Sequence, residues 1–392
     1  MSGSVDYRGI LDFYRGKSVL VTGNTGFKGS WLTHILIGAG AKVTGYSLQP
    51  PTEPALFKII GLDKDERLKQ RYADVRDLDT LKETFEAARP QIVFHLAAQP
   101  IVRDSYKDPV GTYATNVMGT VNVCEAIRTT VDADGLPCTR SFLNVTTDKV
   151  YRNNEWEWGY RETDYLDGFD PYSNSKSCSE LVTHSYKNAF FTQPDGSEPA
   201  VRVSTGRAGN VIGGGDFSND RIIPDCVRAV TEALDEDKNE GAIIVRNRYS
   251  TRPYEHVLEP LFAYLMIAKA QYEDAGYASY YNVGPDDVDC ICTGDLATLF
   301  CNTWNNNDPN SGVVIDEDRF PKVAWINKSD PNAPHEANFL KLDCSKIKSV
   351  FGWRPRWHIN EAINQTINWT KVWMDGGDVK KEMDREIDLF VN

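Results

Sequence analysis

The sequence predicts an α/β fold in which a doubly wound parallel sheet is followed by a smaller, mixed C-terminal domain. Two observations predict the sheet: short apolar runs alternate with amphipathic segments through the first half of the chain, and a glycine-rich turn follows the first run. A third observation indicates the second domain, because after about residue 210 the pattern gives way to loops rich in Gly, Arg and Asn. A chain of 392 residues is long enough for both domains.

The first strand and helix carry the clearest pattern. Residues 17–23 form an apolar run that ends at glycine, and Trp31, Leu32, Ile35 and Leu36 follow it with helical spacing. Further strands are expected at residues 42–48, 70–77, 91–98, 141–147, 200–211 and 279–285, and helices at 79–90, 108–130 and 170–191. Because the strand at 279–285 returns to the sheet, the predicted domains are discontinuous: 1–206 plus about 253–285, and about 207–252 plus 286–392.

Composition and charge exclude several classes of protein. The formal charge of −13, from 43 Lys plus Arg against 56 Asp plus Glu, repels nucleic acid and anionic membranes. The eight cysteines form no regular framework, which predicts reduced thiols in a cytoplasmic protein. Cys290 and Cys292 lack the further cysteines and histidines of a zinc site, so we expect two buried thiols and no metal.

Gly23, Gly26 and Gly29 lie at the first predicted strand-to-helix turn. Missing side chains at such a turn permit a tight bend and let a pyrophosphate approach the N–H groups at the start of the helix. Glycine triplets also occur in ordinary tight turns. Here the strand before the triplet and the helix after it favour dinucleotide binding.

The sequence leaves open whether the dinucleotide is NAD or NADP. In many NAD sites an acid about 20 residues after the glycines binds the adenosine ribose, yet the second strand ends in "GYSLQPP" without one. Asp74, after the third strand, is placed to meet the adenine edge. The alternative is that Asp74 caps the helix that follows.

Tyr172 and Lys176 are four residues apart in a predicted helix, so both side chains emerge from one face. A nearby ammonium stabilises phenolate, which predicts that the pKa of Tyr172 falls from about 10 toward neutrality. The phenolate would then take a proton from a substrate hydroxyl. The same spacing occurs by chance in many helices, and the glycine turn upstream is what favours the functional interpretation.

Thr147, Asp148 and Lys149 end a predicted parallel strand, at the edge where doubly wound sheets carry their chemistry. Thr147 is placed to hydrogen-bond the hydroxyl that Tyr172 deprotonates, while Asp148 and Lys149 add an acid and a candidate base. The alternative is a capping Thr and Asp followed by a solvated lysine.

With these residues assembled, the chain resembles the extended short-chain dehydrogenase/reductase superfamily, whose fold is Rossmann-type, over nearly its whole length. Within it, the chain resembles the nucleotide-sugar dehydratase branch in the blocks "AAQPIVRDSY", "TTDKVY", "EWEWGYRE", "DPYSNSKSCSE", "RAGNVIGGGDFSNDRIIPD" and "RNRYSTRPYEHVLEP". Because these blocks are long and in order, the resemblance is more specific than the short motifs alone.

The resemblance implies a lyase that dehydrates CDP-glucose with tightly held NAD, which is regenerated in each turnover. Tyr172 would remove the C4 hydroxyl proton, Asp148 would protonate the departing C6 hydroxyl, and the hydride taken from C4 would return to C6. Related dehydratases of dTDP-glucose and GDP-mannose carry glutamate where this chain has Lys149, which favours the CDP-sugar branch and leaves the C5 base open. A lysine acts as a base only when neutral, and we predict that role for Lys149.

Further site residues carry over by motif from the same resemblance. Together with Asp74, the predicted cofactor-binding residues are Gly23, Thr25, Gly26, Phe27, Gly29, Leu96, Ala97, Asn116, Tyr172 and Lys176. The predicted substrate-binding residues are Arg103, Asn210, Arg246 and Arg252, of which Arg252 would pair with the diphosphate. As alternatives, Asn116 is a buried polar cap, and Arg246 and Arg252 are surface charges.

Other functions share part of this pattern. A nucleotide-sugar 4-epimerase uses the glycine turn, Tyr172 and Lys176, but it expels no C6 hydroxyl and needs no acid at Asp148. A dehydratase of another nucleotide hexose and a non-catalytic dinucleotide sensor are the remaining alternatives. The resemblance also implies a homodimer, or a tetramer, packed through the helices that begin near Thr112 and Tyr172, although an intrachain core would explain their apolar faces equally well.

Overall fold

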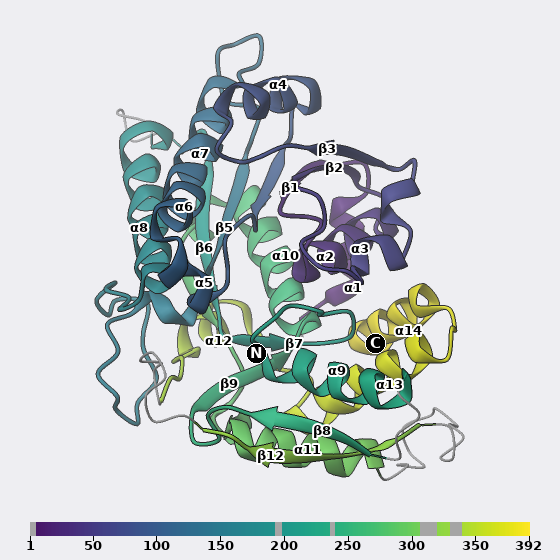
Figure 1. The fold of residues 1–392 in the computed structure, drawn as a ribbon. Coiled ribbons are helices and arrows are strands. Elements are labelled where there is room, and N and C mark those ends of the chain that lie inside the picture. The colour runs from purple at the N-terminus through teal and green to yellow at the C-terminus, as the bar shows by residue number, and fades with distance from the viewer. Residues whose placement is uncertain (1–4, 193–197, 236–239, 306–319, 330–338) are drawn as a thin grey trace.

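The largest element of the protein is a parallel sheet of seven strands in the order β10-β6-β5-β4-β1-β2-β3 (Figure 1). The computed structural model describes residues 5–192, 198–235, 240–305, 320–329 and 339–392. The strands of the sheet are β1 (Ser18–Thr22), β2 (Lys42–Ser47), β3 (Leu68–Tyr72), β4 (Ile92–His95), β5 (Ser141–Thr147), β6 (Arg202–Ala208) and β10 (Tyr280–Val283). All neighbouring strands are parallel, which confirms the predicted doubly wound sheet.

Helices cover both faces of this sheet (Figure 1). They are α1 (Tyr7–Tyr14), α2 (Phe27–Gly38), α3 (Leu56–Ile59), α4 (Leu78–Ala88), α5 (Val102–Lys107), α6 (Pro109–Tyr113), α7 (Gly119–Thr129), α8 (Pro171–Tyr186) and α10 (Leu258–Glu273). Alternate residues of β1 enter different cores, because successive side chains of a strand point to opposite faces. Val19 belongs to the buried cluster that contains Trp31 of α2, and Leu20 to the cluster that contains Leu81 of α4.

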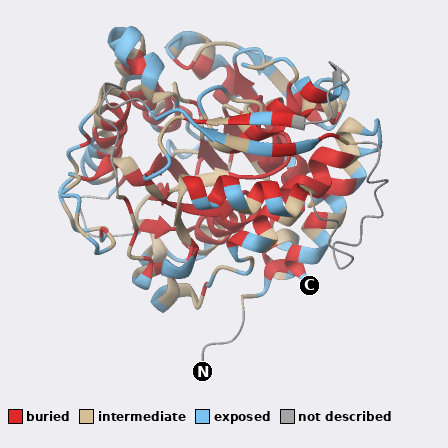
Figure 2. Cartoon of the chain, turned by 60° about the horizontal axis from the view of Figure 1, so that its bottom comes forward, coloured by how far each residue is buried: buried red, intermediate tan, exposed pale blue. Residues whose placement is uncertain are grey.

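The predicted smaller part follows β6 and contains two further sheets. A three-stranded sheet has the order β11-β9-β7, and a two-stranded parallel sheet pairs β12 with β8. Its elements are β7 (Asn210–Ile212), α9 (Ile222–Asp235), β8 (Glu240–Val245), β9 (Thr251–His256), β11 (Cys290–Cys292), α11 (Thr293–Asn305), β12 (Lys322–Asn327), α12 (Ser345–Phe351), α13 (Ile359–Met374) and α14 (Val379–Val391). Figure 2 shows buried residues filling the interior of the whole chain, with exposed residues on the outside.

The predicted domain limits fall near the changes between sheets but do not follow strand ends. Residue 206 lies inside β6, and β9 extends across residue 253 while pairing with β7 and β11. Phe390 of the C-terminal helix α14 packs on Tyr7 and Phe262, which belong to the larger part. The residue limits of the two domains therefore stay a prediction.

Two predicted long helices each contain a wider turn. The helix expected at 108–130 consists of α6, a π turn over Ala114–Met118, and α7. The helix expected at 170–191 consists of α8 and a π turn over Lys187–Phe191. Asp170 starts α8 because its carboxylate accepts the backbone N–H of Ser173, and Pro171 occupies the first helical position.

Candidate active site

The predicted site residues meet at the carboxyl edge of the seven-stranded sheet. Thr22 of β1 is the register neighbour of His95 in β4, which is in turn the neighbour of Asn144 in β5. The chain segments that continue from these three strands therefore lie next to one another. They carry the glycine turn, Leu96 with Ala97, and Thr147 with Asp148.

The glycine turn is packed so closely that no side chain fits at two of its positions. Gly23 has a φ of +71°, and a Cβ there would lie 2.7 Å from the backbone nitrogen of Ala97. A Cβ on Gly29 would lie 2.1 Å from the carbonyl oxygen of Gly23. Gly26 precedes α2 without a side chain to cap the helix. The turn thus has the form that lets a pyrophosphate approach the start of α2.

The residues around this turn have individual partners. The Thr25 hydroxyl donates to the carbonyl of Leu48 at 3.0 Å, and Phe27 packs against the main core. Asp74 pairs with Arg76 at 2.6 Å, and hydrogen bonds from Arg76 lower the pKa of the Asp74 carboxyl. The alternative in which Asp74 caps the next helix is wrong, because Asp77 caps α4.

Thr147 and Asp148 lie together at the end of β5, and Thr147 acts on Tyr172 of α8. The Thr147 hydroxyl donates to Oδ1 of Asp148 at 2.9 Å, and the Thr147 side chain opposes the rise in the pKa of Tyr172. Lys176, one turn after Tyr172 on α8, donates from Nζ to the carbonyl of Val145 at 3.1 Å. The end of β5 and the first turns of α8 thus bring the predicted acid-base residues together.

The prediction that Lys176 lowers the pKa of Tyr172 is wrong for this structure. Burial raises the pKa of Tyr172 to about 12, against smaller opposite effects of the Thr147 hydrogen bond and the charge of Arg221. Burial also lowers the pKa of Lys176 to about 8. The physical reason is desolvation, which disfavours the charged form of both groups.

Asp148 is buried, with 1% of its surface exposed. Burial raises the pKa of its carboxyl, while Lys149, the Thr147 hydrogen bond, Arg252 and Lys28 act in the opposite direction. Its Oδ2 atom has no hydrogen-bond partner among the residues that the structure describes. A buried carboxyl with an unused oxygen is suited to meet a polar group of a ligand.

Asn116 makes three hydrogen bonds within the protein. Its amide accepts from the backbone N–H of Gln99 at 2.8 Å and donates to the Gln99 carbonyl at 3.1 Å and to the Ser175 hydroxyl at 2.9 Å. These bonds support the alternative of a buried polar residue. They also connect the π turn, where Asn116 lies, to α8 one residue before Lys176.

Two of the predicted substrate-binding arginines share a carboxylate. Arg103 of α5 lies 3.6 Å from Asp220, and Arg246 lies 3.3 Å from the same Asp220 oxygen and 2.7 Å from Asp225. Each of the two arginine side chains is about two fifths exposed.

The other two predicted substrate-binding residues lie on the three-stranded sheet. Arg252 is 3% exposed and donates to the carbonyl of Thr251, so it is not a surface charge. Its positive charge lowers the pKa of Asp148, which places it near that acid. Asn210 is half-buried on β7, in register with Tyr254 of β9.

Comparison with known proteins agrees with this geometry. The profile of the family described as GDP-mannose 4,6 dehydratase matches residues 20–366. The CDP-glucose 4,6-dehydratase of Salmonella typhimurium is 40% identical over 382 residues, which cover 97% of this chain and 98% of that protein. The chain belongs to the GDP-mannose 4,6-dehydratase family.

Solved structures share the fold of this family member at low identity. A dTDP-glucose 4,6-dehydratase from Streptomyces venezuelae with NAD bound has a TM-score of 0.67 and 20% identity, over 92% of this chain and 99% of that one. A dTDP-glucose 4,6-dehydratase from Bacillus anthracis in complex with NAD has a TM-score of 0.68 and 17% identity, over 93% of this chain and 100% of that one. These similarities confirm the Rossmann-type fold.

Three groups of this family member, two of them buried and one half-buried, were missed by the sequence analysis. Glu255 of β9 is 1% exposed, and neither of its carboxylate oxygens has a hydrogen-bond partner among the described residues. Burial raises its pKa well above the usual range, and the charge of Asp148 adds to this effect. The hydroxyl of Tyr264 on α10 is equally buried and without a partner in the described part of the chain.

The third missed residue is Lys28, directly after the glycine turn. Burial and Arg221 lower its pKa to about 8, while Glu255 and Asp148 act in the opposite direction. Lys28 thus connects the dinucleotide turn electrostatically to Asp148. A sequence signal existed for Lys28, because it lies in the first turn of a helix that contains no other Lys, Arg, Asp or Glu. Glu255 lies in a strand in which every residue from Arg252 onward is buried.

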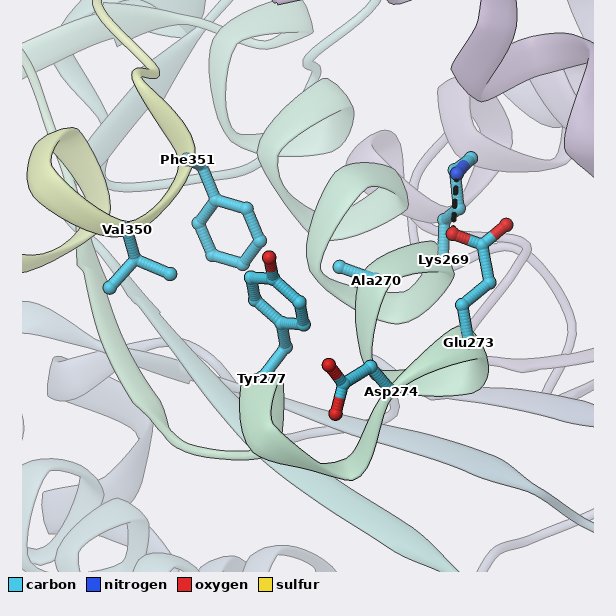
Figure 3. A pocket seen from close by; sticks show the side chains of 7 residues that line it. All are labelled: Lys269, Ala270, Glu273, Asp274, Tyr277, Val350 and Phe351. Carbon is cyan, nitrogen blue, oxygen red and sulfur yellow. Dashed lines mark hydrogen bonds and ion pairs between the residues drawn. The ribbon is translucent and has the colours of Figure 1, made fainter. Parts of the chain in front are cut away.

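A hollow at the opposite edge of the sheet contains none of these groups (Figure 3). It is lined by Lys269, Ala270, Glu273, Asp274, Tyr277, Val350 and Phe351. Figure 3 shows Tyr277 facing Phe351, with ring centroids 5.4 Å apart, and the ion pair between Lys269 and Glu273. The neighbouring Tyr272 accepts a hydrogen bond from Arg140, which precedes β5, so this hollow lies at the amino ends of the strands.

The structure contradicts the prediction that Cys290 and Cys292 are buried thiols. Cys290 and Cys292 are half-buried on β11, an edge strand of its sheet, so the prediction of two buried thiols is wrong. Among the described residues, no group of three or more His, Cys, Asp or Glu side chains is arranged to hold a metal ion. No helix within the described ranges has the length and apolar character needed to span a bilayer.

Proposed function

We propose that this chain is a CDP-glucose 4,6-dehydratase, a hydro-lyase that converts CDP-glucose to CDP-4-keto-6-deoxyglucose and water. The observation that carries the proposal is that Tyr172 of α8 is influenced electrostatically by Thr147 and Asp148 at the end of β5, since this brings a proton acceptor for one sugar hydroxyl together with a proton donor for another. The 40% identity to the Salmonella enzyme over nearly both full lengths supports CDP-glucose as the substrate.

NAD is the proposed cofactor, and the residues present fit a dinucleotide. The closely packed glycines leave backbone rather than side chains beside the start of α2, as pyrophosphate binding requires. The residues proposed to hold NAD are Gly23, Thr25, Gly26, Phe27, Gly29, Asp74, Leu96, Ala97, Asn116, Tyr172 and Lys176. When bound, NAD supplies a reversible acceptor for the hydrogen that leaves C4 and returns at C6.

In this proposal the end of α8 nearest the sheet edge performs the oxidation chemistry. Tyr172 takes the proton of the C4 hydroxyl, while Thr147 orients that hydroxyl through its own hydrogen bonds. Lys176 is held by the Val145 carbonyl one turn farther along the helix, and its amine completes the proposed acid-base set.

The adjacent strand end performs the elimination. Once C4 is a ketone, the C5 proton becomes acidic, and Lys149 is the proposed base that removes it. Asp148 protonates the departing C6 oxygen. The raised pKa of Asp148 suits this role, because a buried carboxyl retains its proton more readily at neutral pH.

The proposed contacts to the nucleotide diphosphate are Arg103, Asn210, Arg246 and Arg252. Arg252 is the strongest of these candidates, because a guanidinium that is 3% exposed and electrostatically coupled to Asp148 lies close to the reacting sugar. Asp220 and Asp225 hold Arg246 by ion pairs, and a diphosphate bound there would compete with these carboxylates.

Incubation of the purified protein with CDP-glucose tests the function. A 4-keto-6-deoxy sugar, recognised by its absorbance in alkali, is expected from CDP-glucose and in much smaller yield from dTDP-glucose or GDP-mannose. Asp148→Asn should retain nucleotide binding but lose about 10²–10⁴-fold in turnover, the usual contribution of general acid catalysis. Recovery of CDP-galactose would instead indicate an epimerase, and unchanged hexose with bound NAD would indicate a sensor.

Further proposals concern the setting of this reaction. We propose that the chain acts in the cytoplasm, in deoxysugar biosynthesis for lipopolysaccharide O-antigen. A homodimer, or a tetramer, packed through α6 to α8 is supported by Val110, Met118 and Leu181, large apolar side chains of these helices that are 79%, 51% and 54% exposed. Light scattering after size-exclusion chromatography would give the assembly mass.

A further inference from the structure

The segment that carries Asp148 and Lys149 is a short turn between two better-fixed regions. β5 ends at Thr147, and Asp148–Val150 form a single 3₁₀ turn before the chain continues to Tyr151. So short a 3₁₀ turn has internal hydrogen bonds of poor geometry. The positions of the Asp148 and Lys149 side chains therefore depend on how the two ends of this turn are held.

Helix α8 makes hydrogen bonds with both ends of the turn. Before the turn, the Thr146 hydroxyl donates to Oε1 of Glu180 at 2.5 Å. After its last residue, the Ser177 hydroxyl donates to the carbonyl of Val150 at 2.7 Å. Glu180 and Ser177 are both on α8, the helix that carries the proposed oxidation groups. The helix of the oxidation groups thus holds the turn of the elimination groups.

Arg207 of β6 connects the two ends to each other. Its guanidinium donates twice to the Glu180 carboxylate, and its Nη1 atom donates to the Tyr151 hydroxyl at 2.7 Å. The Tyr151 hydroxyl donates in turn to Oδ1 of Asn282 at 2.6 Å. Because Tyr151 directly follows the turn, an unbroken series of hydrogen bonds joins Thr146 on one side to Tyr151 on the other.

We propose that the side chains holding the two ends of the turn form a positioning frame, which fixes the elimination groups Asp148 and Lys149 relative to the oxidation group Tyr172. The frame consists of Ser177, Glu180, Arg207 and Tyr151. This inference rests on the proposed dehydratase function. It assigns to these residues a role that is exerted through the acid-base groups and not on the substrate.

The frame lies in the interior, where its hydrogen bonds do not compete with water. Each of its four residues is 2% exposed or less. A buried ion pair adds little stability compared with apolar residues of the same volume, so stability alone does not account for the pair of Arg207 and Glu180. Hydrogen bonds of fixed direction do hold a neighbouring segment in one position, which reacting groups require.

Two substitutions remove a hydrogen bond of the frame without leaving a buried charge unpaired. Tyr151→Phe removes the hydroxyl that accepts from Arg207. Thr146→Val removes the hydroxyl that donates to Glu180, whereas Thr146→Ser retains it. Either substitution tests the frame if the other variant fails to fold.

Tyr14→Phe is the matched control for the loss of a buried hydroxyl. The Tyr14 hydroxyl is buried and donates to the carbonyl of Leu265 at 2.7 Å, outside the frame. Thermal unfolding and calorimetric binding of CDP establish that each variant is folded and binds nucleotide. The control therefore reports the effect of losing one interior hydrogen bond on turnover.

Rapid mixing of the NAD-loaded enzyme with CDP-glucose, followed by the absorbance of reduced nicotinamide, separates oxidation from elimination. In Tyr151→Phe and Thr146→Val the oxidation group keeps its place on α8, while the elimination groups lose theirs. Turnover should fall by about 10²-fold, the cost of a small misplacement, with little change in KM and with accumulation of reduced nicotinamide. Thr146→Ser and Tyr14→Phe should behave as the wild type does.

Two kinetic results would overturn the frame. One is turnover in Tyr151→Phe and Thr146→Val equal to that in Tyr14→Phe. The other is a loss of turnover without accumulated reduced nicotinamide, since oxidation and elimination would then be affected alike.

Hydrogen–deuterium exchange provides a readout that does not require turnover. The backbone amides of residues 147–151 should exchange faster in Tyr151→Phe than in the wild type and in Tyr14→Phe. Equal exchange in all three proteins would show that the frame does not fix this segment. A wild type that forms no product from CDP-glucose would contradict the proposed function, and the exchange measurement would still decide whether the frame holds the turn.

Discussion

Arg207 of β6 and Glu180 of α8 form a doubly hydrogen-bonded ion pair in the interior, with two nitrogen-to-oxygen distances of 2.9 Å. The two side chains are 2% and 1% exposed. Arg207 also donates to the Tyr151 hydroxyl at 2.7 Å. Since Glu180 is one helical turn beyond Lys176, this ion pair fixes α8 against the sheet next to the candidate active site.

Loss of one partner from this pair should be strongly destabilising. Glu180→Gln leaves the Arg207 charge buried without its counter-ion, and the expected loss in free energy of unfolding is about 3–5 kcal/mol. Urea denaturation followed by circular dichroism would measure it. The double variant Glu180→Leu with Arg207→Met should be more stable than Glu180→Gln, because it removes both charges. A Glu180→Gln protein as stable as the wild type would contradict this account.

Glu255 should make the stability of the protein depend on pH. Its pKa is raised in the folded protein, so the folded state keeps a proton that the unfolded state loses above a pH of about 4.3. Stability should therefore fall as the pH rises above that value. Glu255→Gln removes this titration and should stabilise the protein increasingly with pH, by up to about 1.4 kcal/mol per pH unit.

Thermal unfolding midpoints of the wild type and Glu255→Gln between pH 5 and pH 8 would measure this difference. Glu157→Gln is a matched control, because Glu157 is an exposed residue. Its midpoint should follow that of the wild type at every pH. A constant difference between Glu255→Gln and the wild type across the range would show that Glu255 is ionised when folded.

The sheet and the acid-base residues could be predicted from the sequence because their signals are local. Glycines between an apolar run and a helix, and a Tyr and Lys one helical turn apart, specify both an element and a position within it. The end of β5 was likewise predictable, since Thr147 and Asp148 directly follow its apolar residues. Parallel topology then brings these segments to one edge.

The remainder of the site depends on long-range packing and could not be read from short patterns. The raised pKa of Tyr172 results from desolvation by the whole fold, which overrides the Lys176 spacing. Lys28 and Glu255 are 227 positions apart and become coupled only because β9 of the smaller part lies against the start of α2. No short pattern marks Tyr264 either, whose hydroxyl is buried without a partner among the described residues.

Lys28 should affect the ionisation of Asp148. Its positive charge lowers the pKa of Asp148, so Lys28→Met should raise that pKa. The pH profile of kcat/KM for CDP-glucose should contain a limb that arises from Asp148 and is absent in Asp148→Asn. In Lys28→Met this limb should move to higher pH. Lys28→Arg retains the charge and should leave that limb in place. Equal midpoints in Lys28→Met and the wild type would exclude this coupling.

Lys149 should be required for proton removal at C5. Its positive charge opposes the effect of burial on the pKa of Asp148 more strongly than any other group does, so its amine lies close to the proposed elimination chemistry. In D₂O, the wild type should incorporate deuterium at C5 of the product, which mass spectrometry and proton NMR would detect. Lys149→Met should lower turnover by about 10²–10⁴-fold, the range for general base catalysis, and should lower exchange at C5 by a similar factor.

Lys149→Arg is the control, because its guanidinium group stays protonated and keeps the positive charge. It should be equally impaired, which separates the role of a base from a purely electrostatic role. Wild-type exchange in Lys149→Met would require a different base.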